Sequence, residues 1–123
     1  MKAAIPILFV RDVAATADYF RDSLGFTVDF LHGSPPFYGA VSRGEACLHL
    51  RFVHAPVFRD NIDEESLIVA TIEVEDVAAL YAELRKSGAM ITQPLEKQVW
   101  GGTDFYVRDL DGAQISFVEF GKA

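Results

Sequence analysis

The strongest constraint on this chain is an internal repeat. The segment V-R-D-V-A-A-T-A-D-Y-F-R-D-S-L-G-F at residues 10–26 resembles V-E-D-V-A-A-L-Y-A-E-L-R-K-S-G-A at residues 74–89. At an offset of 64 residues, seven of the fourteen positions from 10 to 23 are identical. The recurring residues are Val10, Asp12, Val13, Ala14, Ala15, Arg21 and Ser23, which return as Val74, Asp76, Val77, Ala78, Ala79, Arg85 and Ser87. Such a repeat predicts two copies of one supersecondary unit.

Each copy has the pattern of a strand followed by a helix and three short strands. Asp12 and Asp76 stand at helix N-cap positions, and Gly25 and Gly88 stand where a helix ends in a left-handed residue. The apolar residues between these signals recur on one helical face. Runs of β-branched and apolar residues predict the strands. They are expected at residues 5–10, 26–31, 37–42 and 46–53 in the first copy and at 67–74, 90–92, 103–108 and 113–120 in the second.

The sequence therefore predicts an α+β fold built from two βαβββ modules in a single domain. Module one covers about residues 1–55, module two covers about residues 67–121, and the polar stretch at about 56–66 is the expected linker. One short unit of this kind buries little apolar surface. The two modules are therefore expected to share a core or to pair with another chain.

The charge and the apolar pattern exclude several partners. The net charge is −7, whereas phosphate binding relies on Lys and Arg, so nucleic acid is not an expected ligand. No apolar run approaches the roughly 20 residues of a membrane span, and the N-terminal run is too short for a signal peptide. Cys47 is the only cysteine and cannot form an internal disulfide. We therefore expect a cytoplasmic protein without membrane contact.

The two repeat segments and the later stretch W-G-G-T-D-F-Y-V-R-D-L-D-G-A-Q-I-S-F at residues 100–117 resemble the vicinal oxygen chelate superfamily. This superfamily includes glyoxalase I, extradiol dioxygenases, and the fosfomycin- and bleomycin-resistance proteins. The resemblance covers nearly the whole chain. It implies paired βαβββ modules whose curved sheet surrounds a concave cavity. In metal-dependent members, that cavity holds one divalent ion through His, Gln or Glu side chains from the first and last strands of each module.

The four metal-ligand positions that the resemblance implies match Ile5, His49, Val69 and Ser116. His49 stands in L-H-L, where the family often has L-E-L, and Ser116 stands in I-S-F, where it has I-E-L. Only His49 is a potential ligand, and one imidazole beside two aliphatic side chains and a hydroxyl does not bind a divalent ion stably. A shift of one residue in the first strand of either module brings in no other ligand. We therefore expect no metal ion and no other cofactor.

The chain also resembles the bleomycin-resistance branch of the superfamily in three places. These are I-P-I-L-F-V-R-D-V-A at residues 5–14, F-R-D-N at residues 58–61, and the hairpin W-G-G-T-D-F-Y-V-R-D-L-D-G at residues 100–112. Members of that branch lack the metal and sequester their drug. The resemblance implies a homodimer with exchanged N-terminal strands and with ligand grooves at the dimer interface.

Side-chain alternation along the strands selects candidate ligand-binding residues. His49 and Arg51 share one side and suit an anionic group or a proton carrier, although a lone His is also common as a structural residue. Trp100 precedes two glycines and either stacks on an aromatic ligand or covers its own hairpin. Glu73 either attracts a cation or is a solvent-exposed charge near a strand end. The full candidate set is Trp100, His49, Phe37, Tyr38, Phe58, Arg51, Glu73 and Ser116.

We hypothesise that the protein sequesters an amphipathic aromatic or cationic small molecule in a dimer groove, without metal and without turnover. No Ser-His-Asp set, phosphate-binding loop or carboxylate pair stands out, so no catalytic residue is assigned. Two alternatives stay open. One is a metal-dependent glyoxalase-like lyase or isomerase, or a dioxygenase-related enzyme, with ligands such as His32, His54 or Glu73. The other is a domain whose dimer surface matters more than any pocket.

Overall fold

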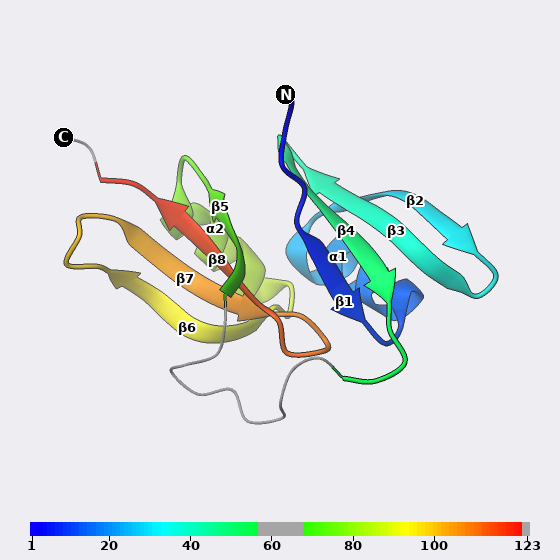
Figure 1. Ribbon diagram of the computed structural model, residues 1–123. Helices are drawn as coiled ribbons and strands as arrows, with labels where there is room; N and C mark the ends of the chain where they lie inside the picture. The colour runs from blue at the N-terminus through cyan, green and yellow to red at the C-terminus, as the bar shows by residue number, and fades with distance from the viewer. Residues whose placement is uncertain (57–67, 122–123) are drawn as a thin grey trace.

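The computed structural model describes residues 1–56 and 68–121, which form two modules with the predicted βαβββ order. Module one comprises β1 (Ile7–Val10), α1 (Val13–Leu24), β2 (Thr27–Gly33), β3 (Pro36–Arg43) and β4 (Ala46–Phe52). Module two comprises β5 (Ile68–Glu73), α2 (Val77–Lys86), β6 (Met90–Lys97), β7 (Thr103–Arg108) and β8 (Gln114–Glu119) (Figure 1). The predicted α+β fold is confirmed. β6 runs five residues past its predicted end, because Pro94 is tolerated in an edge strand.

Each module forms its own four-stranded sheet with one helix against it. The strand orders are β1-β4-β3-β2 and β5-β8-β7-β6. β1 pairs in parallel with β4 of the same chain, β5 pairs in parallel with β8, and the remaining neighbours pair antiparallel. Figure 1 shows the two sheets side by side with α1 and α2 behind them. The opposite face of each sheet is therefore free of helices.

The two helices begin with the same local interaction. The Asp12 carboxylate accepts a hydrogen bond from the Ala15 amide at 2.9 Å, and the Asp76 carboxylate accepts one from the Ala79 amide at 3.0 Å. Gly25, after α1, has a φ of 74°, a left-handed conformation that glycine adopts without a steric penalty. These caps confirm the helix starts that the repeat predicts. Within the described ranges no helix is long and apolar enough to cross a bilayer.

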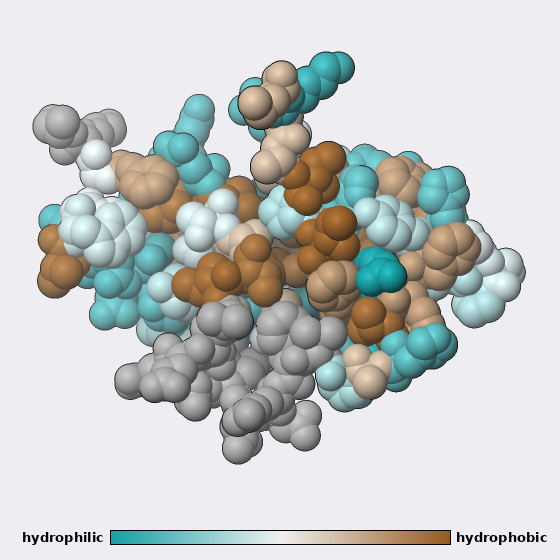
Figure 2. Space-filling view, in the orientation of Figure 1, coloured by the Kyte–Doolittle hydropathy of each residue, from teal (hydrophilic) through white to brown (hydrophobic). Residues whose placement is uncertain are grey.

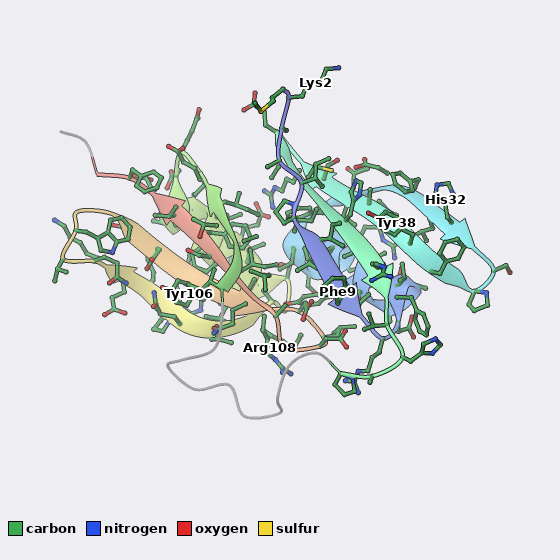
Figure 3. The ribbon with its side chains drawn as sticks, in the orientation of Figure 1. Lys2, Phe9, His32, Tyr38, Tyr106 and Arg108 are labelled. Atoms are coloured by element: carbon green, nitrogen blue, oxygen red, sulfur yellow. The ribbon has the colours of Figure 1, made fainter. Side chains whose placement is uncertain are left out.

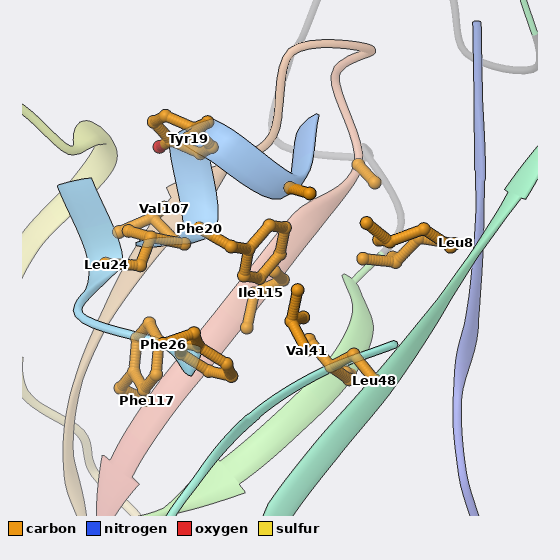
Figure 4. Packing of buried hydrophobic residues seen from close by; sticks show 14 of the residues in the cluster. Leu8, Tyr19, Phe20, Leu24, Phe26, Val41, Leu48, Val107, Ile115 and Phe117 are labelled. Carbon is orange, nitrogen blue, oxygen red and sulfur yellow. The ribbon is translucent and has the colours of Figure 1, made fainter. Parts of the chain in front are cut away.

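The hydrophobic core is continuous across the two modules. Residues from α1 and module one form a single buried cluster with residues from β7 and β8 of module two. Figure 4 shows Phe20 of α1 beside Ile115 of β8, and Phe26 beside Phe117. The expectation that the modules share a core is therefore met within one chain.

Polar contacts reinforce the junction between the modules. The Tyr19 hydroxyl on α1 donates to the Arg108 carbonyl at 2.7 Å and accepts from the Met90 amide at 3.0 Å. The Arg43 guanidinium binds both carboxylate oxygens of Glu83, at 2.7 and 2.9 Å. This two-point contact lowers the pKa of Glu83. Because Tyr19 is buried, its loss would leave two backbone groups without a partner.

The turn between β7 and β8 is organised around a buried carboxylate. One oxygen of Asp109 accepts hydrogen bonds from the amides of Asp111 and Ala113, both at 2.9 Å. The other oxygen, Oδ2, is buried without a hydrogen-bond partner among the described residues. Burial raises the pKa of Asp109 to about 6. The D-L-D-G sequence therefore fixes this turn at the cost of a desolvated carboxylate.

Candidate functional site

The face of the first sheet opposite α1 carries two rows of aligned side chains, which we call the basic aromatic face. Cross-strand partners point to the same side of a sheet. Figure 3 shows Phe9, Tyr38 and His32 spread across this face. The partners in one row are Phe9, Arg51, Tyr38 and His32, and those in the next row are Ile7, His49, Ala40 and Phe30.

A hydrogen bond links two of the predicted site residues on this face. The Tyr38 hydroxyl lies 2.8 Å from Nδ1 of His49. The Phe30 ring centroid lies 5.8 Å from that of His49 and 4.9 Å from that of His32. Ala40 lies between His49 and Phe30 in the register and is only 2% exposed. His49 is therefore held by Tyr38 and lies in edge-to-face contact with Phe30, and Ala40 is covered beside them.

Arg51 supplies the fixed positive charge of the basic aromatic face. Its guanidinium carbon lies 5.7 Å from the centroid of the Phe9 ring, which is a cation–π distance. The side chain is exposed, and it forms no ion pair with a carboxylate of the described part of the chain. Within residues 1–56 and 68–121, its guanidinium is therefore exposed and without a carboxylate partner.

The corresponding face of the second sheet is more acidic and more enclosed. Ser116 is 4% exposed and is the register partner of Tyr106. The Asp104 carboxylate accepts hydrogen bonds from the side-chain amides of Gln93 and Gln98, at 2.8 and 2.9 Å. Burial, together with the Asp104 charge, raises the pKa of Tyr106. Tyr106 is therefore a neutral phenol and Ser116 a small buried hydroxyl.

A cleft lies between the two modules. One part of it, about 640 Å³, is lined by residues 4–6, 45–48 and 69–73. A second part, about 700 Å³, extends towards α2 and shares Glu45 and Glu73 with the first. Glu73 is exposed at this position. Both expectations for Glu73 fit this placement, because a solvent-exposed carboxylate beside a cleft also attracts cations.

Trp100 lies at the tip of the hairpin between β6 and β7. Its ring packs over its own loop, since a Cβ built on Gly102 would lie 2.0 Å from the ring. The centroid of the Phe120 ring lies 6.0 Å away. Trp100 nevertheless remains 56% exposed. The indole therefore covers the hairpin and still offers much of its surface to a ligand.

The predicted site residues fall into two groups on different modules. Tyr38, His49 and Arg51 meet on the basic aromatic face, whereas Phe37 precedes Tyr38 in β3 and points to the opposite side. Phe37 is 58% exposed there. The second group, Glu73, Trp100 and Ser116, belongs to module two, and Phe58 lies outside the described residues.

Sequence reasoning missed two aromatic members of the basic aromatic face and gave a third residue another role. Phe9 and Phe30 were not assigned to the site, and His32 was considered only as a metal ligand. Their alternation along β1 and β2 was visible in the sequence. Their proximity to His49 and Arg51 depends on the strand register, which the sequence alone does not specify.

Comparison with known proteins identifies the fold family. Residues 3–117 match the family described as the Glyoxalase/Bleomycin resistance protein/Dioxygenase superfamily. The chain belongs to this superfamily. The resemblance inferred from the repeat and from the closing turn is therefore confirmed.

Curated and solved members of the superfamily align with nearly the whole chain. Bleomycin resistance proteins of Geobacillus stearothermophilus and Staphylococcus aureus (strain N315) are each 30% identical over 131 residues, covering 97% of both chains. The bleomycin-binding protein of Streptomyces verticillus, solved with copper(II)-bleomycin, is 29% identical at a TM-score of 0.77 and covers 99% of this chain and 98% of its own. A glyoxalase/bleomycin resistance protein/dioxygenase from Alicyclobacillus acidocaldarius has a TM-score of 0.81 at 13% identity, covering 98% and 92%. That last likeness shows the fold alone.

The positions of the superfamily's metal ligands do not form a metal site in this member. Ile5 and Val69 line the cleft with apolar side chains, His49 binds Tyr38 on the first sheet, and Ser116 is buried in the second. Across residues 1–56 and 68–121, no three His, Cys, Asp or Glu side chains group closely enough to hold an ion, and the alternative ligands His32, His54 and Glu73 are among those searched. The residues at these positions therefore do not fit a divalent cation.

Proposed function

We propose that this protein is a metal-independent binding protein that sequesters an amphipathic aromatic or cationic small molecule without turning it over. The observation that carries this proposal is the match to bleomycin resistance proteins over 97% of both chains. Bleomycin is the first ligand to test, because the relatives are named for resistance to it. The apolar residues at two of the four metal-ligand positions, Ile5 and Val69, support a function that needs no metal.

The ligand groove is proposed to form between two copies of the chain. Tyr38, His49 and Arg51 lie on module one, whereas Trp100 lies on the outer hairpin of module two. Figure 1 shows β3 and the β6–β7 hairpin at opposite ends of the molecule. A two-fold dimer places module one of each copy against module two of its partner, and so encloses a ligand that neither copy encloses alone.

An apolar surface supports this dimer. Figure 2 shows hydrophobic side chains gathered over β1 and the neighbouring edge of module two. Homodimer interfaces are richer in apolar area than the rest of a protein surface. In the described chain β1 pairs with its own β4, so an exchange of N-terminal strands in the dimer would replace this pairing with the partner's β4. The exposed apolar residues of this surface are Ile5, Ile7, Phe9 and Ile68.

Calorimetric titration with bleomycin tests the proposed function. We expect a dissociation constant near or below about 1 μM, or about −8 kcal/mol, and recovery of unmodified ligand by mass spectrometry. Trp100→Ala should weaken binding at least about fivefold, because stacking on an indole contributes about 1–3 kcal/mol. Val99→Ala is the matched control, since Val99 is fully exposed on the same hairpin. No binding heat, or conversion of the ligand, would contradict sequestration.

Mixed dimers test the shared groove. Copies carrying Trp100→Ala and copies carrying His49→Ala should each bind weakly. After random subunit exchange, tight sites should reappear at about a quarter of the wild-type number, because each mixed dimer has one intact groove and one doubly altered groove. If the groove lay within one chain, exchange would restore no tight sites.

Elemental analysis of the purified protein tests metal independence. We expect less than about one-tenth of an equivalent of Ni, Zn, Mn or Fe per chain, because three of the four positions lack a competent ligand. About one equivalent of any of these metals would contradict metal independence and favour a metal-dependent lyase or isomerase.

A further inference from the structure

We propose that the basic aromatic face selects the acidic group of an aromatic ligand, so that the ligand class it favours is a fused-ring carboxylate or sulfonate. This inference rests on the proposed function, because it specifies the charge of the group bound at one half of the same groove. The juxtaposition behind it is an exposed Arg51 beside a tethered His49, among aromatic side chains of three other strands.

The first argument is the charge on this face. The arginines at positions 11, 21 and 43 each form an ion pair with a carboxylate, whereas Arg51 has no ion-pair partner in the described ranges. On the open side of β3, the Asp29 carboxylate accepts a hydrogen bond from Ser42 at 2.9 Å. Ser42 is four residues from Tyr38 along β3, about 13 Å in an extended strand. Among the described residues, the charge beside Arg51 is therefore positive in a chain whose net charge is −7.

The second argument is the hydrogen-bonding capacity of His49. Its Nδ1 is occupied by the Tyr38 hydroxyl at 2.8 Å. In the tautomer in which that hydroxyl donates to Nδ1, the imidazole carries its proton on Nε2. In that tautomer Nε2 is a donor on the same side of β4 as the Arg51 guanidinium. Two donors of this kind match the two oxygens of a carboxylate.

The third argument is the shape of the aromatic surface around His49 and Arg51. The His49 and Phe30 rings are in edge-to-face contact, with centroids 5.8 Å apart, and Ala40 between them is only 2% exposed. Four strands at about 4.8 Å spacing give the face a width of about 14 Å, and its two rows lie about 7 Å apart. These dimensions suit a flat fused ring lying across these side chains. An aromatic carboxylate therefore places its ring against Phe30 and its oxygens towards Arg51 and His49.

The same geometry disfavours a cationic group at this position. The Arg51 guanidinium lies 5.7 Å from the Phe9 ring and already occupies that aromatic face. A second positive charge placed there would be repelled by Arg51, which has no carboxylate partner within the described ranges. Cationic parts of a ligand are instead suited to module two and the cleft, where Glu45 and Glu73 are located.

Three naphthalene probes of matched size test this inference by calorimetry at low and high salt. They are naphthalene-2-carboxylate, naphthalen-2-ylmethanol and naphthalen-2-ylmethylammonium. We expect the carboxylate to bind at least about tenfold more tightly than the alcohol and the ammonium to bind least, since a charge-assisted pair contributes about 1.5–3 kcal/mol. Raising NaCl from about 0.05 to 1 M should reduce the preference, because Arg51 is exposed to screening.

Two arginine variants show whether the preference arises at the basic aromatic face. Arg51→Gln should abolish the preference for the carboxylate while leaving binding of the alcohol within about twofold. Arg85→Gln is the matched control, because Arg85 is also exposed and lies 5.5 Å from the Tyr81 ring, away from this face. Arg85→Gln should leave the preference unchanged.

Failure of this inference is separable from failure of the proposed function. Equal binding of all three probes, or a carboxylate preference that survives in Arg51→Gln, would overturn the anion selectivity and leave sequestration intact. Absence of binding by all three probes would also overturn it, and the bleomycin titration would then decide the proposed function independently.

Discussion

Replacing Asp109 by asparagine is expected to change how the stability of this protein depends on pH. Burial raises the pKa of Asp109 to about 6 from its ordinary 3.8. Between these two values the folded chain binds a proton that the unfolded chain releases. The protonated carboxyl therefore favours the folded state at low pH, and this contribution is lost as the pH rises through 6. An asparagine side chain does not titrate, so the Asp109→Asn variant lacks this dependence.

The size of the effect follows from the displacement of the pKa. A rise of about two pH units corresponds to about 3 kcal/mol over the whole window. About 1.4 kcal/mol of this falls between pH 8 and pH 5. Measurements are best kept above the isoelectric point near 4.8, where a net charge close to zero promotes association. The free energy of unfolding of the wild type minus that of the variant should thus increase by about 1.4 kcal/mol from pH 8 to pH 5.

Urea denaturation of both proteins at several pH values measures this difference. Asp22 and Glu83 have lowered pKa values, so their contributions to the free energy of unfolding change with pH in the opposite direction. Both residues are present in wild type and variant, so these contributions cancel in the difference. The difference in the free energy of unfolding between wild type and Asp109→Ala should change with pH by the same amount. Asp109→Ala should be less stable than Asp109→Asn at every pH, because it also loses the bonds from the Asp111 and Ala113 amides. A difference that stays constant within about 0.3 kcal/mol from pH 5 to pH 8 would refute a desolvated carboxylate at this turn.

Three further predictions follow from the fold, each measured by the free energy of unfolding in urea. Tyr19→Phe removes the hydroxyl that ties α1 to β6 and β7 and should cost about 1–3 kcal/mol, whereas Tyr81→Phe, without such a bond among the described residues, should cost less than about 0.5 kcal/mol. Asp12→Ala and Asp76→Ala should each cost about 1 kcal/mol, and unequal losses beyond twofold would contradict equivalent caps. Ser116→Glu should destabilise the protein by at least about 3 kcal/mol without adding bound metal by elemental analysis, since it buries a carboxylate among non-ligands.

The sequence predicted the parts of the fold that depend on local signals. The Asp12 and Asp76 caps, the helical apolar faces and the order of the strands all arise within short segments, so pattern alone identified them. The end of β6 was missed because Pro94 usually ends a strand in the interior of a sheet, and the edge position of this strand was not visible in the sequence.

The candidate site was less predictable because it depends on contacts between strands. Alternation correctly placed His49 and Arg51 on one side of β4, but it carried no information about which residues of β1 and β2 lie beside them. Phe37 and Tyr38 were grouped as neighbouring aromatics, yet a strand sends adjacent side chains to opposite faces. The members that sequence reasoning left out, Phe9 and Phe30, are those that only the register brings to His49 and Arg51.

The repeat that defines the fold also underlies the proposed shared groove. Each βαβββ module covers one face of its sheet with its own helix, and the two helix-covered faces merge into one core. Neither remaining face carries a helix: one is basic and aromatic around Arg51, and the other is more enclosed and holds the buried Asp104 carboxylate. Because the modules lie side by side, these faces do not oppose each other within the chain (Figure 1). In the dimer that we propose, module one of each copy faces module two of the other, and a ligand held between them would meet Arg51 on one side and the carboxylates of module two on the other.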